Sequence, residues 1–136
     1  MKLMSYQHKA IVVDLLQQID KAIDNLAEWN KEYACSNDFL TSPSGMKTLA
    51  ADCMLIEAIG DGLKKIDSKT DGQLLPLRSE IPWKQVKGMR DHIAHGYFDI
   101  NVDFVWDVIE NDIEPLRQAI RYFINYLETD DAPTTM

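Results

Sequence analysis

Apolar residues recur every three or four positions along most of this chain, which is the spacing of one face of an α-helix. Residues 6–33 keep this spacing with no Pro or Gly, and polar residues fill the other face. The pattern predicts a long amphipathic helix. Its apolar positions are Val12, Leu15, Leu16, Ile19, Ile23 and Leu26.

A second helix is expected over residues 44–66, because residues 41–45 combine turn residues with N-cap candidates. It carries two apolar stripes, so we expect it to be central, or to contact both its own core and a partner chain. Gly60 and Gly62 each cost roughly 1 kcal/mol relative to Ala in a helix. Two such residues within one turn predict a close approach to a neighbouring helix.

The third predicted helix is short and starts at Pro82, which suits a first helical turn. We expect it to reach Ala94 or His95, with Gly96 ending it, after a polar surface loop over residues 67–80. A fourth helix starts near Val102, with N-cap candidates in residues 99–101, and Pro115 should kink or split it near Ile113. No segment alternates like a strand. The fold class is therefore all-α, an up-and-down bundle of four or five helices forming one domain over residues 1–128, with a flexible tail over 129–136.

Composition narrows the function classes. The 136 residues carry a net charge of −8, which argues against tight, sequence-independent nucleic-acid binding. The charge is uneven: residues 41–98 hold eight basic and seven acidic side chains, whereas residues 99–136 hold two and nine. Two cysteines, Cys35 and Cys53, indicate no disulfide framework, so a reducing cytoplasm is the expected location. We expect no signal peptide, and no apolar stretch approaches the ~18 residues of a membrane span.

The chemistry concentrates between Arg90 and Tyr97, where a guanidinium, a carboxylate, two imidazoles and a phenol fall within eight residues. On a continuous helix Asp91 and His95 are four apart and can pair. Arg90 and His95 would then flank a strip wide enough for a phosphate, with Arg offering a donor fork and His a proton-transfer group. A neighbouring carboxylate and a helix C-terminus would favour a charged His95, as a general acid or a phosphate clamp.

Simpler interpretations remain open at this point. Such an Asp–His pair is often only a solvated surface pair. His92 and His95 with Asp91 offer at most three metal ligands, and no obvious fourth ligand exists, so no metal or other cofactor is expected. Trp83, Trp106 and Tyr97 are expected in the core or an interface rather than in a base-stacking platform.

The motif Arg90-x4-His95-x-Tyr97 resembles the R-x4-H-x-Y motif of HepT-like proteins in the HEPN superfamily, the toxin halves of modules whose antitoxin is a minimal nucleotidyltransferase. Other segments also match that family in order and approximate spacing, so the resemblance covers residues 36–116. They are Ser36-Asn37-Asp38-Phe39-Leu40, Ile59-Gly60-Asp61-Gly62, Ile81-Pro82-Trp83, Arg90-Asp91, His95-Gly96-Tyr97 and Val105-Trp106.

The resemblance implies a homodimer in which two copies of the motif face each other across a composite cleft. It further implies metal-independent RNA cleavage, in which a ribose 2′-hydroxyl attacks the adjacent phosphate while Arg90 and His95 position and neutralise it. Tyr97 matches the tyrosine that the nucleotidyltransferase antitoxin modifies with AMP. This bulky anion would block the cleft by charge and size.

Two residues depart from the family pattern. Asp91 stands where the family often has Asn, and a carboxylate repels a phosphate to which an amide would donate a hydrogen bond. Asp61 shortens the acidic side chain of the family's I-G-E-A segment, which the resemblance places near the site. The leading hypothesis is thus a ribonuclease toxin with Arg90, His95 and Asp91 at its catalytic site. The alternatives are a catalytically silent HEPN dimer that acts as a scaffold, and a helical domain that binds a nucleotide.

Overall fold

A computed structural model describes residues 4–94, 96, 98–129 and 134–135 of the chain. Within this part the molecule is helical, apart from one pair of two-residue strands. The elements are β1 (Met4–Ser5), α1 (Tyr6–Asn30), the 3-10 helix η1 (Ser36–Leu40), α2 (Pro43–Lys69), the 3-10 helix η2 (Leu75–Arg78), α3 (Trp83–Lys87), α4 (Arg90–Ile93), α5 (Val102–Asp107), the π-helical turn η3 (Val108–Asp112), α6 (Ile113–Glu128) and β2 (Thr134–Thr135).

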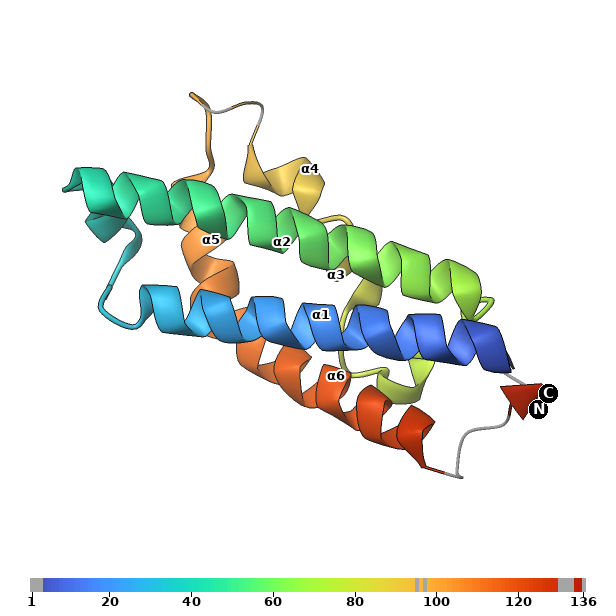
Figure 1. Ribbon diagram of the computed structural model, residues 1–136. Helices are drawn as coiled ribbons and strands as arrows, with labels where there is room; N and C mark the ends of the chain where they lie inside the picture. The colour runs from blue at the N-terminus through green and yellow to red at the C-terminus, as the bar shows by residue number, and fades with distance from the viewer. Residues whose placement is uncertain (1–3, 95, 97, 130–133, 136) are drawn as a thin grey trace.

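Three long helices, α1, α2 and α6, form the body of the molecule, and α1 runs antiparallel to the other two (Figure 1). The short helices α3 and α4 cover α2 on its other side. The predicted apolar face of α1 is buried as expected, with Leu15 at its edge. Burial of this stripe against α2 and α6 stabilises the bundle. The all-α prediction is confirmed.

Helix α2 is the central element, as its two apolar stripes predicted. Ser42 caps it by accepting a hydrogen bond from the Gly45 backbone N–H at 2.9 Å, and Pro43 occupies the first turn. Both glycines mark close approaches. A Cβ on Gly60 would lie 3.3 Å from the Lys87 carbonyl oxygen, and one on Gly62 would lie 3.1 Å from the Ile19 side chain.

The third predicted helix is wrong in its extent. It is split into α3 and α4 by a turn at Gly88 and Met89, and it ends at Ile93, because Ala94 is extended and bridges to Ile100. The Ile93 carbonyl accepts a hydrogen bond from the Asn101 backbone N–H at 2.7 Å. This returning loop takes the bond that a continuing helix would have used.

The fourth predicted helix is split, as Pro115 suggested. The π-helical turn η3 separates α5 from α6 and ends at Asp112, directly before Ile113. Asn101 is the N-cap of α5, since its side chain accepts from the Phe104 N–H at 3.0 Å. Because α5, η3 and α6 follow one another without a gap, the described residues form five α-helical stretches, which agrees with the four or five that were predicted.

Two smaller predictions also need correction. The segment expected to be a polar surface loop contains η2 and buries Leu74 and Leu75. No strand was expected, but Met4–Ser5 and Thr134–Thr135 pair in parallel. None of the helices in the described residues combines the length and apolar character needed to cross a membrane. Dimerisation and the predicted flexibility of the tail stay predictions.

Candidate functional site

Arg90 is the first residue of α4, and its position depends on how α4 is anchored. Met89 and Ile93, on either side of it in the chain, are buried in the core. The bare Gly60 lets the end of α3 approach α2 closely. These contacts hold α4 against α2, while the Arg90 side chain, 51% exposed, reaches across the surface of α2.

Two carboxylates of α2 hold the Arg90 guanidinium. Its Nη2 donates to Asp61 Oδ2 at 2.6 Å, and its Nη1 lies 3.7 Å from Glu57 Oε2. Glu57 and Asp61 are four residues apart and therefore lie on one face of α2. The hydrogen bond from Arg90 lowers the pKa of Asp61, and the charges of Lys64 and Lys65 lower it further. The same hydrogen bond raises the pKa of Arg90, so this guanidinium stays charged.

Asp91 is exposed and its side chain points away from the buried face that holds Ile93. The expected stacking of Asp91 on His95 required one continuous helix, and α4 ends between them at Ile93. The helical spacing that was expected to bring Asp91 and His95 together is therefore absent, and their pairing stays a prediction. His95 and Tyr97 lie outside the described residues. Gly96 between them is described, and its φ of 146° is one that glycine tolerates best.

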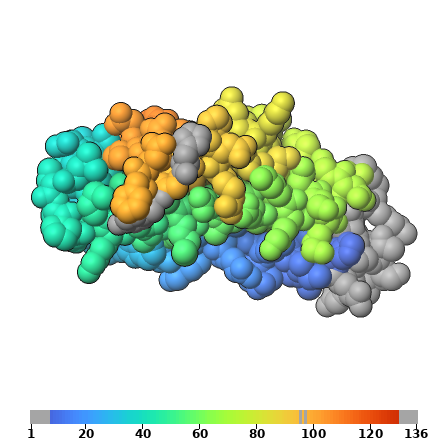
Figure 2. Space-filling view, turned by 90° about the horizontal axis from the view of Figure 1, so that it is seen from above, coloured from blue at the N-terminus to red at the C-terminus, as the bar shows by residue number. Residues whose placement is uncertain are grey.

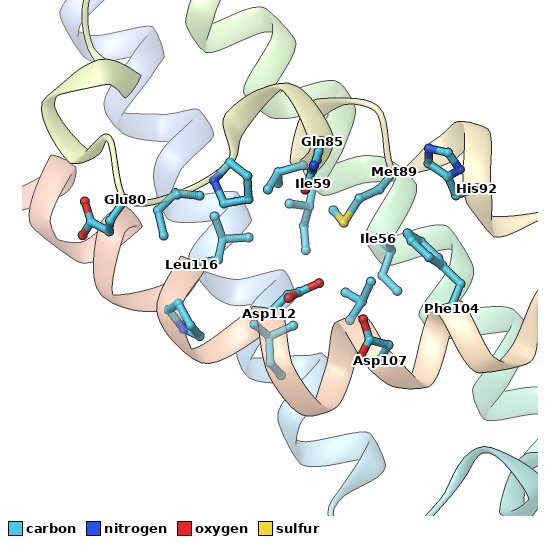
Figure 3. A pocket seen from close by; sticks show the side chains of 16 residues that line it. Ile56, Ile59, Glu80, Gln85, Met89, His92, Phe104, Asp107, Asp112 and Leu116 are labelled. Carbon is cyan, nitrogen blue, oxygen red and sulfur yellow. The ribbon is translucent and has the colours of Figure 1, made fainter.

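His92 lies on a different surface from Arg90. Its ring is tilted against that of Phe104, with centroids 5.6 Å apart, at the edge of a cavity of about 550 Å³ (Figure 3). Apolar side chains of α2, α3 and α6 line this cavity, together with the carboxylates of Glu80, Asp107 and Asp112. No Lys or Arg is among its described lining residues. Such a cavity is unsuited to a phosphate, which leaves Arg90 as the phosphate-binding candidate.

The described residues contain no group of three His, Cys, Asp or Glu side chains placed to hold a metal ion. Trp83 and Trp106 are packed, as predicted. The ring of Trp83 lies 5.7 Å from Phe123 and that of Trp106 lies 5.9 Å from Phe39, centroid to centroid. Both rings are partly buried against the core, as expected of packing residues.

Sequence reasoning found Arg90 and placed Asp61 near the site, but it missed Glu57. The signal was present in the spacing, because Glu57 precedes Asp61 by four residues on a helix that had been predicted. It also missed Lys64 and Lys65 beside Asp61. The uneven distribution of charge had indicated only that residues 41–98 are less acidic than the rest of the chain.

Comparisons with known proteins agree with the resemblance. A family model described as "Ribonuclease HepT-like" matches residues 19–123. A protein of Thermococcus cleftensis named "Probable ribonuclease HepT" is 34% identical over 104 residues, which cover 76% of this chain and 87% of that protein. A protein of Methanocaldococcus jannaschii named "Putative RNase MJ1216" is 30% identical over 123 residues, covering 90% of this chain and 92% of that protein.

No solved structure gives a significant match. The family match includes η1, the C-terminal half of α1, the whole of α2, and Arg90 with both of its carboxylate partners. The residues that build the site are thus inside the matched region. This chain belongs to the HepT-like ribonuclease family.

Proposed function

We propose that this protein is a metal-independent endoribonuclease and the toxin of a toxin–antitoxin module, whose partner is a minimal nucleotidyltransferase. The observation that supports it most directly is Arg90. This exposed guanidinium is held at the head of α4 by two carboxylates of α2, inside the region matched to the ribonuclease family.

The proposed reaction is an internal transfer at phosphorus. The ribose 2′-hydroxyl oxygen attacks the adjacent phosphorus, the bond to the 5′ oxygen breaks, and a cyclic phosphate and a 5′-hydroxyl end are formed. Arg90 neutralises the charge that builds on the phosphate oxygens in the transition state. His95 carries a proton to or from the reacting oxygens. Asp91, the next residue after Arg90, is the third member of the proposed catalytic site. The role of His95 rests on the sequence motif.

A homodimer would complete the site electrostatically. In one chain the Arg90 guanidinium is surrounded by the carboxylates of Glu57, Asp61 and Asp91, so the local charge is negative. A second copy of the motif facing the first would add another Arg and another His, and so make the cleft fit for a phosphate.

The surface beside the site also favours a subunit contact. Met54 is 72% exposed and precedes Glu57 and Asp61 by three and seven residues, which places it on the same face of α2. Methionine is among the residues that are enriched at protein interfaces. We infer that this face of α2 contacts the second subunit.

Purified protein should therefore cleave RNA in the presence of a chelator, and Arg90→Ala and His95→Ala should each abolish the cleavage. The matched control is Asp20→Ala, which removes an ion pair between α1 and α6, made with Arg121. This variant should keep full activity. RNA left intact by wild-type protein, in a preparation shown to be folded, would contradict the proposal.

A catalytically silent scaffold is the second candidate. The observation in its favour is the same carboxylate environment, because Arg90 is already neutralised within its own chain. The two candidates differ in cells: an active toxin inhibits growth and His95→Ala relieves it, whereas wild type and His95→Ala of a scaffold give equal growth.

A further inference from the structure

A second hollow lies next to the Arg90 site, between the C-terminal half of α2 and the start of α3 and α4. It has a volume of about 700 Å³ and is distinct from the apolar cavity at His92. In Figure 2 the yellow atoms of α3 and α4 lie beside the light green atoms of α2 on this face. We call it the lysine groove, after Lys64 of α2 and Lys84 and Lys87 of α3, which line it.

The lysine groove belongs to the one strongly basic part of the chain. Residues 64–90 contain seven of the 14 Lys and Arg residues and only three of the 22 Asp and Glu residues. This segment therefore carries a formal charge of +4 (7 − 3), and the rest of the chain carries −12 (7 − 19). This segregation along the chain favours attraction of a polyanion to the surface that residues 64–90 form, despite the negative total.

The groove is continuous with the site. Asp91, which follows Arg90 in the chain, is one of its lining residues. The charges of Lys64 and Lys65 both act on Asp61, the carboxylate that holds Arg90. A strand whose phosphate lay at Arg90 would therefore meet the groove as its next contact.

The groove has the chemistry of a backbone-binding channel. Lys87 is fixed by an ion pair from its Nζ to Asp67 Oδ2 at 2.7 Å, whereas Lys64 and Lys84 extend into solvent. Gly72 and Gly88 leave main chain bare at the surface of the groove. Asp67, Asp71 and Asp91 also line it, one carboxylate for each lysine, so binding must depend on the exposed Lys64 and Lys84 rather than on a net positive charge of the groove.

No apolar side chain lines the groove among the residues that the structure describes there. Protein interfaces depend on apolar and aromatic anchors at their centre, and this surface provides none. A sugar–phosphate backbone needs only cations and hydrogen-bond donors. The lining thus favours RNA over a protein partner.

We propose that the lysine groove binds the phosphodiester backbone of the RNA strand that leads away from Arg90, with Lys64 and Lys84 each contacting a phosphate. This inference rests on the proposed ribonuclease function and adds the path of the substrate. Binding there is independent of base sequence, because phosphate contacts carry no sequence information.

The test separates binding from cleavage. Binding of a fluorescent single-stranded RNA is measured by anisotropy at several salt concentrations, with His95→Ala as the background to prevent cleavage. Adding Lys64→Gln and Lys84→Gln should weaken binding on the order of tenfold at 0.1 M salt, equally for unrelated sequences. The slope of log affinity against log salt should fall by about 1.4, because each phosphate contact on a single strand contributes roughly 0.7.

The matched control is Lys21→Gln with Lys47→Gln, which removes the same charge at exposed positions outside the groove. If the two pairs change affinity and salt slope equally, the groove proposal is wrong, whether or not wild-type protein cleaves RNA. If the groove pair weakens RNA binding and wild-type protein cleaves nothing, the groove stands and the proposed ribonuclease function fails. If the groove pair leaves RNA binding intact but weakens the complex with the nucleotidyltransferase, the groove is a protein-docking surface and the RNA proposal is overturned.

Discussion

Arg90 and Asp61 are 29 residues apart in the chain, yet their side chains meet at 2.6 Å and form the tightest ion pair around the candidate site. The pair joins the head of α4 to the middle of α2. Because it is exposed, its contribution to stability is small. Its importance is geometric, since it decides where the charge of Arg90 is presented.

Removing Asp61 should therefore damage catalysis more than folding. We expect Asp61→Ala to lower kcat for RNA cleavage by roughly tenfold or more, because a misplaced catalytic group costs rate steeply, while the melting temperature stays nearly unchanged. Asp61→Glu, which restores the longer acidic side chain of the family pattern, should keep activity. Equal kcat values for wild type and Asp61→Ala would show that Asp61 does not position Arg90.

Gly60 should tolerate no β-branched side chain. Its missing Cβ faces the carbonyl oxygens of Lys87 and Val86 at 3.3 and 3.4 Å, and backbone atoms cannot move aside as a side chain can. Gly60→Val should cost about 1–3 kcal/mol of unfolding free energy and should also lower cleavage, because α4 would shift. Ala58→Val, on an exposed position of the same helix, is the control. A chemical denaturation curve for each variant decides the comparison.

The buried pair Asp52–Asn30 should make the protein less stable as the pH rises from about 4 to about 7. Burial raises the pKa of Asp52 to about 7, although a hydrogen bond from Asn30 Nδ2 at 2.9 Å opposes the shift. The unfolded chain, with an ordinary carboxyl pKa, binds fewer protons over this range, so the free energy of unfolding falls with pH. Each pKa unit corresponds to about 1.4 kcal/mol, so the total effect is at most a few kcal/mol.

Asp52→Asn should remove this pH dependence and stabilise the protein at pH 8. Among the described residues, Asp52 Oδ2 and Asn30 Oδ1 are buried oxygens without a hydrogen-bond donor. A proton on Asp52, or the amide of an introduced Asn, supplies one. Thermal melts of both proteins from pH 4 to 8 test this, and parallel curves for the two would contradict it.

Met54→Asp should dissociate the proposed dimer without unfolding the chain. The Met54 side chain is 72% exposed in one chain, so a carboxylate there costs little unless a second subunit covers it. Sedimentation should show monomers and RNA cleavage should be lost. Leu77→Asp, at another exposed apolar residue, should stay dimeric and active. A wild-type protein that sediments as a monomer would refute the interface.

Co-expression with the nucleotidyltransferase partner and ATP should add AMP to Tyr97, as the mass of the peptide that contains it would show. The modified protein should lose RNA cleavage, because a phosphate at the cleft repels the substrate. Tyr97→Phe should escape this control and stay toxic in the presence of the partner. An unmodified peptide with an active partner would disprove the regulatory proposal.

The sequence by itself determined the helical class, the extents of α1 and α2 to within a few residues, and the disruption near Pro115. It also located Arg90 and, through the resemblance, the family. These features depend on the periodicity, caps and residue types of single segments, and all of these can be read from neighbouring residues in the sequence.

Only the tertiary structure decided which groups meet. The helical spacing assumed for Asp91 and His95 does not hold, because α4 ends at Ile93, where a hydrogen bond from Asn101 competes with the local preference for helix. Glu57 joined the site, Asp52 was buried beside Asn30, and lysines of two helices came to line one groove. Each of these depends on packing between residues that are distant in the chain. The residue pattern of a single segment does not reveal that packing, which can override local preference.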